Sequence, residues 1–513
     1  MGSSAGRWVL AVAVLGSGMA FLDSTVVNVA LPDIGRDLDA STSSLQWILN
    51  GYVLTLASLI LLGGSLGDRH GRRRIFALGT GAFTVASLLC AIAPNAALLT
   101  VARLLQGVGG ALLTPGSLAM IESSFRPADR AAAIGAWSGL GGVAAALGPL
   151  LGGYLVDAVS WRAIFLINLP LGIFVMTMAA RHVPESRDPT ASGHLDFVGA
   201  TLAGLGLAGT TYALIEAPEK GATPLILLAG IGGVVALAAF LLGERRSRNP
   251  MMPLEIFASR QFSAANLVTF VVYAALSGFF FLLVAFLQIS LGYSPIAAGA
   301  ASLPVTALML LFSARSGALA QRIGARIPLT AGPLVIAVGL LLMTRIEPGD
   351  GYVSSVLPAV IVFGLGLTLV VAPVTATALA AADARHSGIA SGINNAVARV
   401  AGLLAVAVLP VIAGLTGESF YDPVAMADGF HVAMVACAVL AAAGGLLAFL
   451  TISSEILEAV PATHGETPDR AATDHSCAVA GTPLRPAREA RCTPIAAAGS
   501  PRSVPIEAAG KQR

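Results

Sequence analysis

The chain has 513 residues, of which 56% are hydrophobic and only 11% are charged. Soluble domains carry about 25% charged residues, so this composition excludes an ordinary soluble protein and indicates a chain that lies mainly in lipid. The net charge of +2 is too small to indicate a nucleic-acid partner. Neither the four cysteines nor the seven histidines show the spacing of a metal site, and no metal is expected.

Enzyme chemistry is not indicated. The only lysines are Lys220 and Lys511, and neither stands in the Gly-x-x-x-x-Gly-Lys pattern that places a lysine on nucleotide phosphates. The sequence shows no acid pair or nucleophile–base arrangement at a water interface. We therefore expect a protein that is not an enzyme and that needs no cofactor.

Fourteen stretches are long and apolar enough to cross a membrane as helices, which predicts an all-α polytopic membrane protein. They span residues 8–30, 45–66, 75–93, 98–120, 131–156, 163–181, 197–216, 224–243, 263–287, 297–316, 328–346, 354–378, 389–414 and 430–452. An even number of spans puts both termini on one side. The connections on that side carry sixteen arginines, against four basic residues on the other, and positive residues favour the cytoplasm. Both termini are predicted to be cytoplasmic.

The first span contains Asp23, the only acid deep within any predicted span. At 1.5 Å per residue it lies roughly 20 Å from the cytoplasmic end of the helix, near or just beyond the middle of the bilayer. Desolvation there favours the protonated carboxyl. An acid inside a membrane indicates function by default, such as proton relay. The alternative is a buried acid permanently bonded to nearby backbone.

The loop after the second span repeats later in the chain. "GSLGDRHGRRR" (Gly64–Arg74) and "GALAQRIGAR" (Gly317–Arg326) share one Gly-x-Leu-x-x-Arg-x-Gly-x-Arg pattern, 253 residues apart. The offset predicts six-helix bundles over 8–181 and 263–452, with two inserted helices over 197–243. Repeated bundles that rock about a central site are the architecture of secondary transporters. The polar segment 453–513 is predicted to be a disordered cytoplasmic tail.

The fourth and fifth spans carry further unusual residues. Arg103, Gln106, Gly107 and Gly110 follow helical spacing and share one face, so this polar stripe is expected to face the bundle interior. Arg103 could otherwise simply bind helix carbonyls. The fifth span is rich in glycine and contains one proline, which predicts close helix contact and a bend; these residues are Gly135, Gly139, Gly148, Pro149, Gly152 and Gly153.

Several polar and aromatic residues are expected to line a substrate cavity for bulky lipophilic or cationic compounds. They are Asn28, Trp47, Tyr52, Gln106, Asn394 and Asn395. Asn395 and Arg399 are four residues apart and can support each other. These side chains could instead face lipid or hold helices together, and both interpretations stay open.

Six segments resemble the major facilitator superfamily, in its fourteen-helix drug/proton antiporter branch. They are the Gly64–Arg74 loop, "LDSTVVNVALP" (22–32), "WILNGY" (47–52), "RLLQGVGGA" (103–111), "GAWSGLGGVAAALGPLLGG" (135–153) and "WRAIFLINLP" (161–170). The resemblance implies that Asp23 and Arg103 take part in proton transfer, and that the glycine-rich helix marks an exporter. It also implies a cytoplasmic gate formed by Gly64, Asp68, Arg69, Gly71, Arg72 and Arg73, for which Glu122 is a candidate partner. The loop could instead be a solvated basic segment that only sets the topology. The second-half loop has Gln321 at the position that corresponds to Asp68. A gate at that loop is therefore expected to be weaker or differently built.

The sequence therefore predicts a monomeric exporter in the cytoplasmic membrane that exchanges protons for hydrophobic or cationic drugs by alternating access. Its partners would be a small substrate, protons and the lipid bilayer, and the proton gradient would supply the energy. Export of an endogenous metabolite or lipid is the alternative. A membrane scaffold without transport is more remote, since it needs neither repeated halves nor a central acid.

Overall fold

The computed structural model describes residues 4–187, 195–247, 250–382 and 387–457, which form helices joined by short connections. Fourteen helical segments in these residues are long and apolar enough to cross a membrane. This finding confirms the predicted all-α polytopic fold and the number of spans. Most of the predicted tail lies outside the described residues, which end at 457; Ser454–Leu457 form a short 3₁₀ helix, η5.

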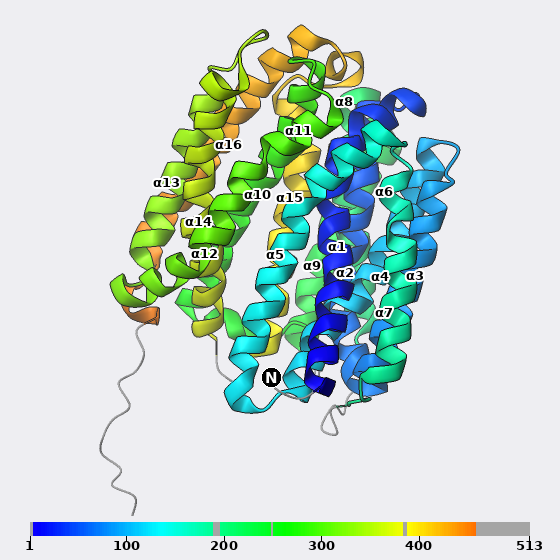
Figure 1. The fold of residues 1–513 in the computed structure, drawn as a ribbon, viewed down its shortest axis with the longest axis vertical. Coiled ribbons are helices and arrows are strands. Elements are labelled where there is room, and N and C mark those ends of the chain that lie inside the picture. The colour runs from blue at the N-terminus through cyan, green and yellow to red at the C-terminus, as the bar shows by residue number, and fades with distance from the viewer. Residues whose placement is uncertain (1–3, 188–194, 248–249, 383–386, 458–513) are drawn as a thin grey trace, which may run out of the picture. The chain divides into compact units, whose positions relative to one another are not determined.

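The N-terminal half contains six spans (Figure 1), the sixth of which is made of two consecutive helices, α6 and α7. Its helices are α1 (Ser4–Asp37), α2 (Thr42–His70), α3 (Arg72–Ala91), α4 (Ala96–Ser124), α5 (Pro127–Ala158), α6 (Ala163–Leu166) and α7 (Asn168–His182). Two of the starts are capped by side chains: Ser41 accepts from the amide of Ser44, and Asn95 from the amide of Leu98. Such caps satisfy amides that have no partner inside the helix.

The C-terminal half also contains six spans. Its helices are η1 (Leu254–Ala258), α10 (Arg260–Ile289), α11 (Pro295–Ala301), α12 (Leu303–Ile323), α13 (Arg326–Met343), η2 (Tyr352–Val356), α14 (Leu357–Ala380), α15 (Ser387–Ile412), η4 (Gly417–Phe420) and α16 (Pro423–Thr451). Because both halves cross an even number of times, the start of α1 and the end of α16 lie at one face, called here the terminal face (Figure 1).

Two inserted helices, α8 (Phe197–Lys220) and α9 (Pro224–Arg246), join the halves and pack mainly on each other. Both run a few residues past their predicted ends: α8 ends at Lys220 instead of residue 216, and α9 ends at Arg246 instead of residue 243. Two further acids, Glu216 and Glu244, are buried near the C-terminal ends of these helices. Asp23 is therefore not the only buried acid in the helices, although no predicted span holds another acid away from its ends.

The helix α8 is fastened to α2 near the opposite face. The indole of Trp47 donates to Glu216 Oε1 at 2.9 Å, and Lys220 Nζ lies 2.6 Å from Glu216 Oε2. The backbone amide and hydroxyl of Ser43 both donate to Glu219, at 3.1 and 2.9 Å. These polar contacts hold the inserted pair on the N-terminal half.

The two halves are hydrogen-bonded to each other toward the opposite face. Gln46 donates to the carbonyl of Val406 and Gln288 to that of Val29, each at 2.8 Å. The hydroxyl of Tyr421 donates to the carbonyl of Ala40 at 2.6 Å. Burial raises the pKa of Tyr421 to about 12, so this phenol remains a donor at neutral pH. Direct bonds thus join the two halves at this face.

The two repeated loops are built alike at the terminal face. Gly71 (φ +110°) separates α2 from α3, and Gly324 (φ +84°) separates α12 from α13. Both have backbone conformations that glycine adopts and other residues avoid. Each loop packs on the segment that follows the last helix of its half. A Cβ at Gly71 would stand 2.6 Å from Glu185 Oε1, and one at Gly324 would stand 2.5 Å from the carbonyl oxygen of Ser454.

Candidate functional site

Asp23 lies on α1 with 0% of its side chain exposed. Its Oδ2 accepts from Arg103 Nη1 at 2.5 Å, and its Oδ1 accepts from Gln106 Nε2 at 2.8 Å and from Asn168 Nδ2 at 3.3 Å. Each of these bonds is donated to the carboxylate. An ionised carboxylate accepts only, so this arrangement fits Asp23 in its charged form.

Arg103 on α4 is the counter-charge of this carboxylate and is also buried, with 1% exposed. Its Nε donates to the carbonyl of Ile48 on α2 at 3.0 Å. The guanidinium lies over the ring of Tyr52, 4.5 Å from the ring centroid, and 5.8 Å from the centroid of Phe165. The aromatic faces and the carbonyl compensate part of the cost of burying the charge.

Gln106, one helical turn after Arg103, connects the pair to α3. Its Oε1 accepts from Arg103 Nη1, and its Nε2 donates both to Asp23 and to Ser87 Oγ, the latter at 2.9 Å. The bonds of Arg103 and Gln106 to α1, α2 and α3 agree with the predicted inward polar face. Gly107, on the same stripe, packs so closely on the backbone of Tyr52 that a Cβ would overlap it.

Ser87 and Asn168 belong to the same cluster, although the sequence analysis did not select them. Asn168 Nδ2 donates to Ser87 Oγ at 3.3 Å as well as to Asp23. Asn168 Oδ1 is buried without a hydrogen-bond partner in the structure. Both residues are isolated polar side chains in apolar runs, "VASLLCAI" and "IFLINLP", and that isolation was the available signal.

The cluster has a direct chemical consequence. All of its side chains come from α1, α3, α4 and the start of α7, and each is at most 1% exposed. If Asp23 took up a proton, it would lose its charge and with it most of its attraction to Arg103. Arg103 would then be a buried cation in need of another partner. A change of charge at this carboxyl would therefore alter the contacts among four helices.

The predicted gate residues meet at the terminal face, but not all of them as expected. Asp68 at the end of α2 accepts from Arg72 Nε at the start of α3 at 2.8 Å, and the two form an ion pair across Gly71. Glu185, rather than Glu122, binds the neighbouring arginines: it accepts from the Arg73 amide at 3.1 Å and lies 3.6 Å from Arg74 Nε.

The other gate residues lie close by. Glu122 is half-buried within electrostatic reach of Arg72 and Arg130. Gly64 packs on Pro115, at ordinary contact distance, and Arg69 is half-buried on α2. Glu185 was missed because it lies beyond the end of the sixth span, far from the loop in sequence.

The glycine-rich helix α5 packs closely along only one part of its length. A Cβ at Gly152 would press on Val26, and Gly148 and Gly153 are equally tight against α1 and α11. No atom lies within 4 Å of a Cβ placed at Gly135 or Gly139. The predicted close contact therefore holds for the second part of the run only.

Pro149 inside α5 removes the amide that would have bonded to the carbonyl of Ala145. The hydroxyl of Thr25 on α1 donates to that carbonyl at 2.9 Å. A side chain of the first helix thus replaces the bond that the proline removes, two residues from Asp23. This contact links the position of α5 to the helix that carries the buried acid.

The residues predicted to line a substrate cavity lie in different places. Gln106 belongs to the buried cluster, Tyr52 on α2 packs against its Arg103, and Trp47 binds the inserted helix α8. Asn394 donates to Asn266 Oδ1 at 3.2 Å and to Thr269 Oγ1 at 2.9 Å, and so joins α15 to α10.

Asn395 and Asn28 are the other two residues predicted to line the substrate cavity. Asn395 accepts from Arg399 at 3.4 Å, as its spacing predicted, and Asn28 is half-buried on α1. The structure does not bring the six residues together at one site.

Comparison with protein families identifies the chain. Residues 13–406 match the family model described as Major Facilitator Superfamily. The methylenomycin A resistance protein of Bacillus subtilis is 38% identical over 418 residues, covering 81% of this chain and 89% of that protein. The tetracenomycin C resistance and export protein of Streptomyces glaucescens is 36% identical and covers 82% of this chain and 78% of that protein.

Solved structures give the same fold. A bacterial homologue of the human lysosomal transporter Spinster, in an inward-facing and unoccupied conformation, superposes with a TM-score of 0.65 at 19% identity. It covers 90% of this chain and 100% of its own. A D-xylose–proton symporter superposes with a TM-score of 0.63 at 14% identity, covering 88% of this chain and 99% of its own. At these identities the likeness concerns the fold alone.

Proposed function

We propose that this chain, which belongs to the Major Facilitator Superfamily, exports hydrophobic or cationic antibiotics across the bacterial cell membrane in exchange for protons. It would work as a monomer driven by the proton gradient, without a cofactor. Relatives at 36–38% identity over about four-fifths of the chain are named for resistance to methylenomycin A and puromycin and for export of tetracenomycin C. These names support drug export as the direction of transport.

The buried Asp23–Arg103–Gln106 network is the observation that carries proton coupling. A charged pair in the interior of a half, fully desolvated, is costly unless it is used. Its carboxyl alternates between a charged form held by three donors and a neutral form that releases Arg103. Each protonation event therefore changes the balance of contacts among α1, α3, α4 and α7, which is what alternating access requires.

The contacts between the halves support an assignment of state. With both termini in the cytoplasm, as the arginine distribution predicts, the face joined by Gln46, Gln288 and Tyr421 is the external one. The protein is then closed to the outside, and Asp23 is in the form expected after it has released its proton inward. The next step of the cycle would be the uptake of a drug from the inner side.

The test is transport in sealed vesicles with and without an imposed proton gradient, comparing wild type with Asp23→Asn. The variant keeps the shape of the side chain but cannot carry the proton. We expect folded protein that is less stable than wild type, because Arg103 loses its counter-charge, and that shows no gradient-driven efflux. Asp39→Asn is the matched control, since Asp39 is exposed in a turn (φ +48°) that asparagine adopts readily. Undiminished efflux by Asp23→Asn at wild-type expression would refute the proposal.

The substrate is tested separately by a resistance profile across chemically diverse compounds. We expect resistance to several lipophilic or cationic antibiotics, all lost in Asp23→Asn. Proton-driven efflux without resistance to any added drug would instead favour the export of an endogenous metabolite or lipid.

A further inference from the structure

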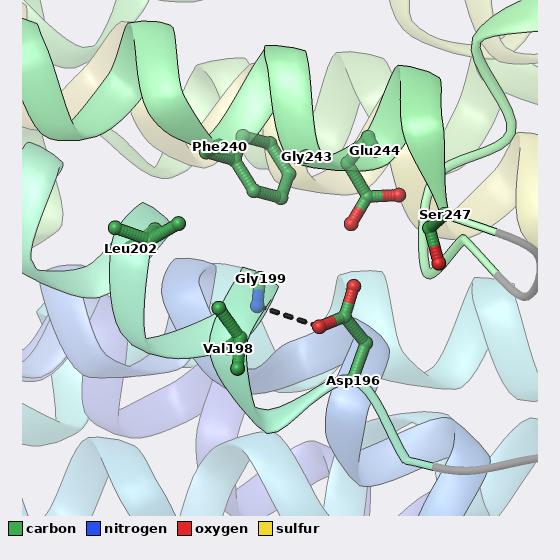
Figure 2. A pocket seen from close by; sticks show the side chains of 8 residues that line it. All are labelled: Asp196, Val198, Gly199, Leu202, Phe240, Gly243, Glu244 and Ser247. Atoms are coloured by element: carbon green, nitrogen blue, oxygen red, sulfur yellow. Dashed lines mark hydrogen bonds between the residues drawn. The ribbon is translucent and has the colours of Figure 1, made fainter.

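Arg399 on α15 lacks the kind of partner that the buried acids of the spans have. Asp23 is paired with Arg103. The carboxyl groups of Asp196 and Glu244 face each other between α8 and α9 (Figure 2), where one proton shared between them satisfies both. No carboxylate among the described residues forms an ion pair with Arg399. Its positive charge is therefore not balanced by the chain around it.

The guanidinium of Arg399 belongs to the middle of a membrane-spanning helix. Arg399 comes twelve residues after Ser387 and thirteen before Ile412, the two ends of α15, which is roughly 18 Å from either end at 1.5 Å per residue. The side chain is half-buried, and its one hydrogen bond within the described chain runs from Nε to Asn395 Oδ1 at 3.4 Å. A charge at this depth is costly, so it is expected to face the interior of the protein and to mark a substrate or ion pathway.

Contacts on both sides of Arg399 show where its side chain points. Residues three, four and seven apart share a side of a helix. Gly392, seven residues earlier, packs on Leu61 of α2, and Gly402, three residues later, packs on Ser277 of α10. The residue that follows Arg399 belongs instead to the apolar contact with α8. Arg399 thus points into the angle between α2 and α10, where the N-terminal half meets the C-terminal half.

Tyr273 of α10 lies at the level of Arg399. The bond from Asn394 to Thr269 and the glycine contact with α10 described above pair the two helices in register, and Arg399 and Tyr273 both lie midway between these contacts. Tyr273 and Tyr52 of α2 are within electrostatic reach of the guanidinium. The half-buried Tyr273 makes no hydrogen bond through its hydroxyl in the part of the chain that the structure describes.

These two side chains have the donors that an anion needs. A guanidinium presents five N–H donors in a planar fork that matches a carboxylate, and a phenol can donate one more hydrogen bond. Because Asp23 and Arg103 compensate each other, Arg399 leaves an unbalanced positive charge between the halves. A cationic compound would be repelled there, whereas an anionic compound would be attracted.

We propose that the exported compound is a lipophilic acid whose anionic group binds Arg399, with the hydroxyl of Tyr273 as a second donor. This inference rests on the exporter function proposed above and narrows it. The substrates are hydrophobic compounds that carry a carboxylate or an acidic hydroxyl, rather than cations. Arg399 is then a specificity-determining residue of the C-terminal half, separate from the proton cluster of the N-terminal half.

The binding of matched probes to the purified full-length protein in detergent tests this proposal. The probes are dansyl-aminoundecanoic acid, its primary amide and the corresponding dansyl-amine, which at about pH 7.5 are an anion, a neutral molecule and a cation with the same body. Energy transfer from tryptophan to the dansyl group measures the bound probe. We expect wild type to bind the acid about tenfold more tightly than the amide, as charge-assisted hydrogen bonds provide, and to bind the amine most weakly.

Four variants make the result specific to the site. Arg399→Gln should bring the ratio of acid to amide affinity close to one, whereas Arg399→Lys keeps the charge without the fork and should retain part of it. Tyr273→Phe removes only a hydroxyl and should lower the ratio about threefold, which tests the site even if Arg399→Gln does not fold. Arg345→Gln is the control, because it removes an exposed positive charge between α13 and η2 and should leave the ratio unchanged.

Equal binding of acid and amide by wild type, or an undiminished preference in Arg399→Gln, would overturn the proposal. The binding assay needs no proton gradient, so its result is independent of the efflux test of Asp23. Gradient-driven efflux by a protein that does not prefer the acid would refute this inference alone. A preference for the acid that depends on Arg399, in a protein without gradient-driven efflux, would support the anion site and refute the proposed exporter function.

Discussion

The centres of the two halves are filled by opposite chemistry. In the N-terminal half, Asp23 and Arg103 form a buried ion pair that Gln106 extends to α3. In the C-terminal half, the core is aromatic: the rings of Phe279 and Phe363 lie with their centroids 4.0 Å apart. The two halves each have six spans, but the residues at their centres differ in chemical character. We infer that the first half responds to protons and that the second offers it a packed surface to move against.

The largest effect should follow from breaking the charged centre on one side only. Arg103→Met leaves Asp23 buried without its counter-charge, and we expect a loss of about 3–5 kcal/mol of stability. Unfolding of the purified protein in detergent, followed by tryptophan fluorescence, measures it. Transport should be lost as well.

A double variant separates stability from function. Asp23→Leu combined with Arg103→Met replaces the whole pair by apolar groups, which is often neutral for stability. We expect it to unfold near the wild-type temperature and yet to transport nothing. If it were as unstable as Arg103→Met alone, the pair would be a structural element of the half rather than a proton site.

A smaller effect should separate the two repeated loops. Gly71→Ala and Gly324→Ala both force alanine into glycine conformations, at a cost of about 1–3 kcal/mol each. The new methyl group would meet the flexible side chain of Glu185 in the first loop, but the backbone of Ser454 in the second. We therefore expect Gly324→Ala to lower the unfolding temperature more than Gly71→Ala. The reverse order would mean that Glu185 is held as rigidly as backbone.

Much of the fold was predictable because it depends on local composition. The fourteen spans follow from apolar length, and the two loops follow from a pattern repeated 253 residues apart. The inward face of Arg103 and Gln106 follows from helical spacing. These signals are contained within single helices or loops, which is why they were readable without the structure.

The parts that could not be predicted depend on contacts between helices. Asn168 and Ser87 bond to Asp23 and Gln106 from two other spans, and nothing in their local sequence specifies that meeting. Glu185 replaced Glu122 as the partner of the loop arginines for the same reason. The sequence analysis did not select Glu216 or Glu244, because the predicted spans ended at residues 216 and 243 whereas the helices continue to Lys220 and Arg246.

Asn394 offers a further prediction, on the C-terminal side of the comparison. It bonds to Asn266 and Thr269 on α10, and a hydrogen bond between membrane helices contributes about 0.6 kcal/mol on average. Asn394→Ala should therefore lose about 1 kcal/mol of stability in the detergent unfolding assay while keeping its resistance profile. Asn395→Ala is the neighbouring control. If Asn394→Ala changed the resistance profile without a loss of stability, Asn394 would instead be a residue of the substrate cavity.

The smallest effect concerns how each loop is held. In the first loop, the carboxylate of Glu185 lies 3.7 Å from Arg73 and 3.6 Å from Arg74; in the second, Arg326 donates instead to the neutral carbonyl of Ile452 at 2.7 Å. Partly exposed ion pairs contribute about 0.2–1 kcal/mol and are screened by salt. Glu185→Gln should therefore lower the unfolding temperature slightly in about 0.05 M NaCl, and hardly at all in about 0.5 M. Arg326→Gln removes a bond to an uncharged group, so its effect should be the same at both salt concentrations. An equal salt dependence of the two variants would mean that the loops are held by the same kind of interaction, despite the exchange of Asp68 for Gln321.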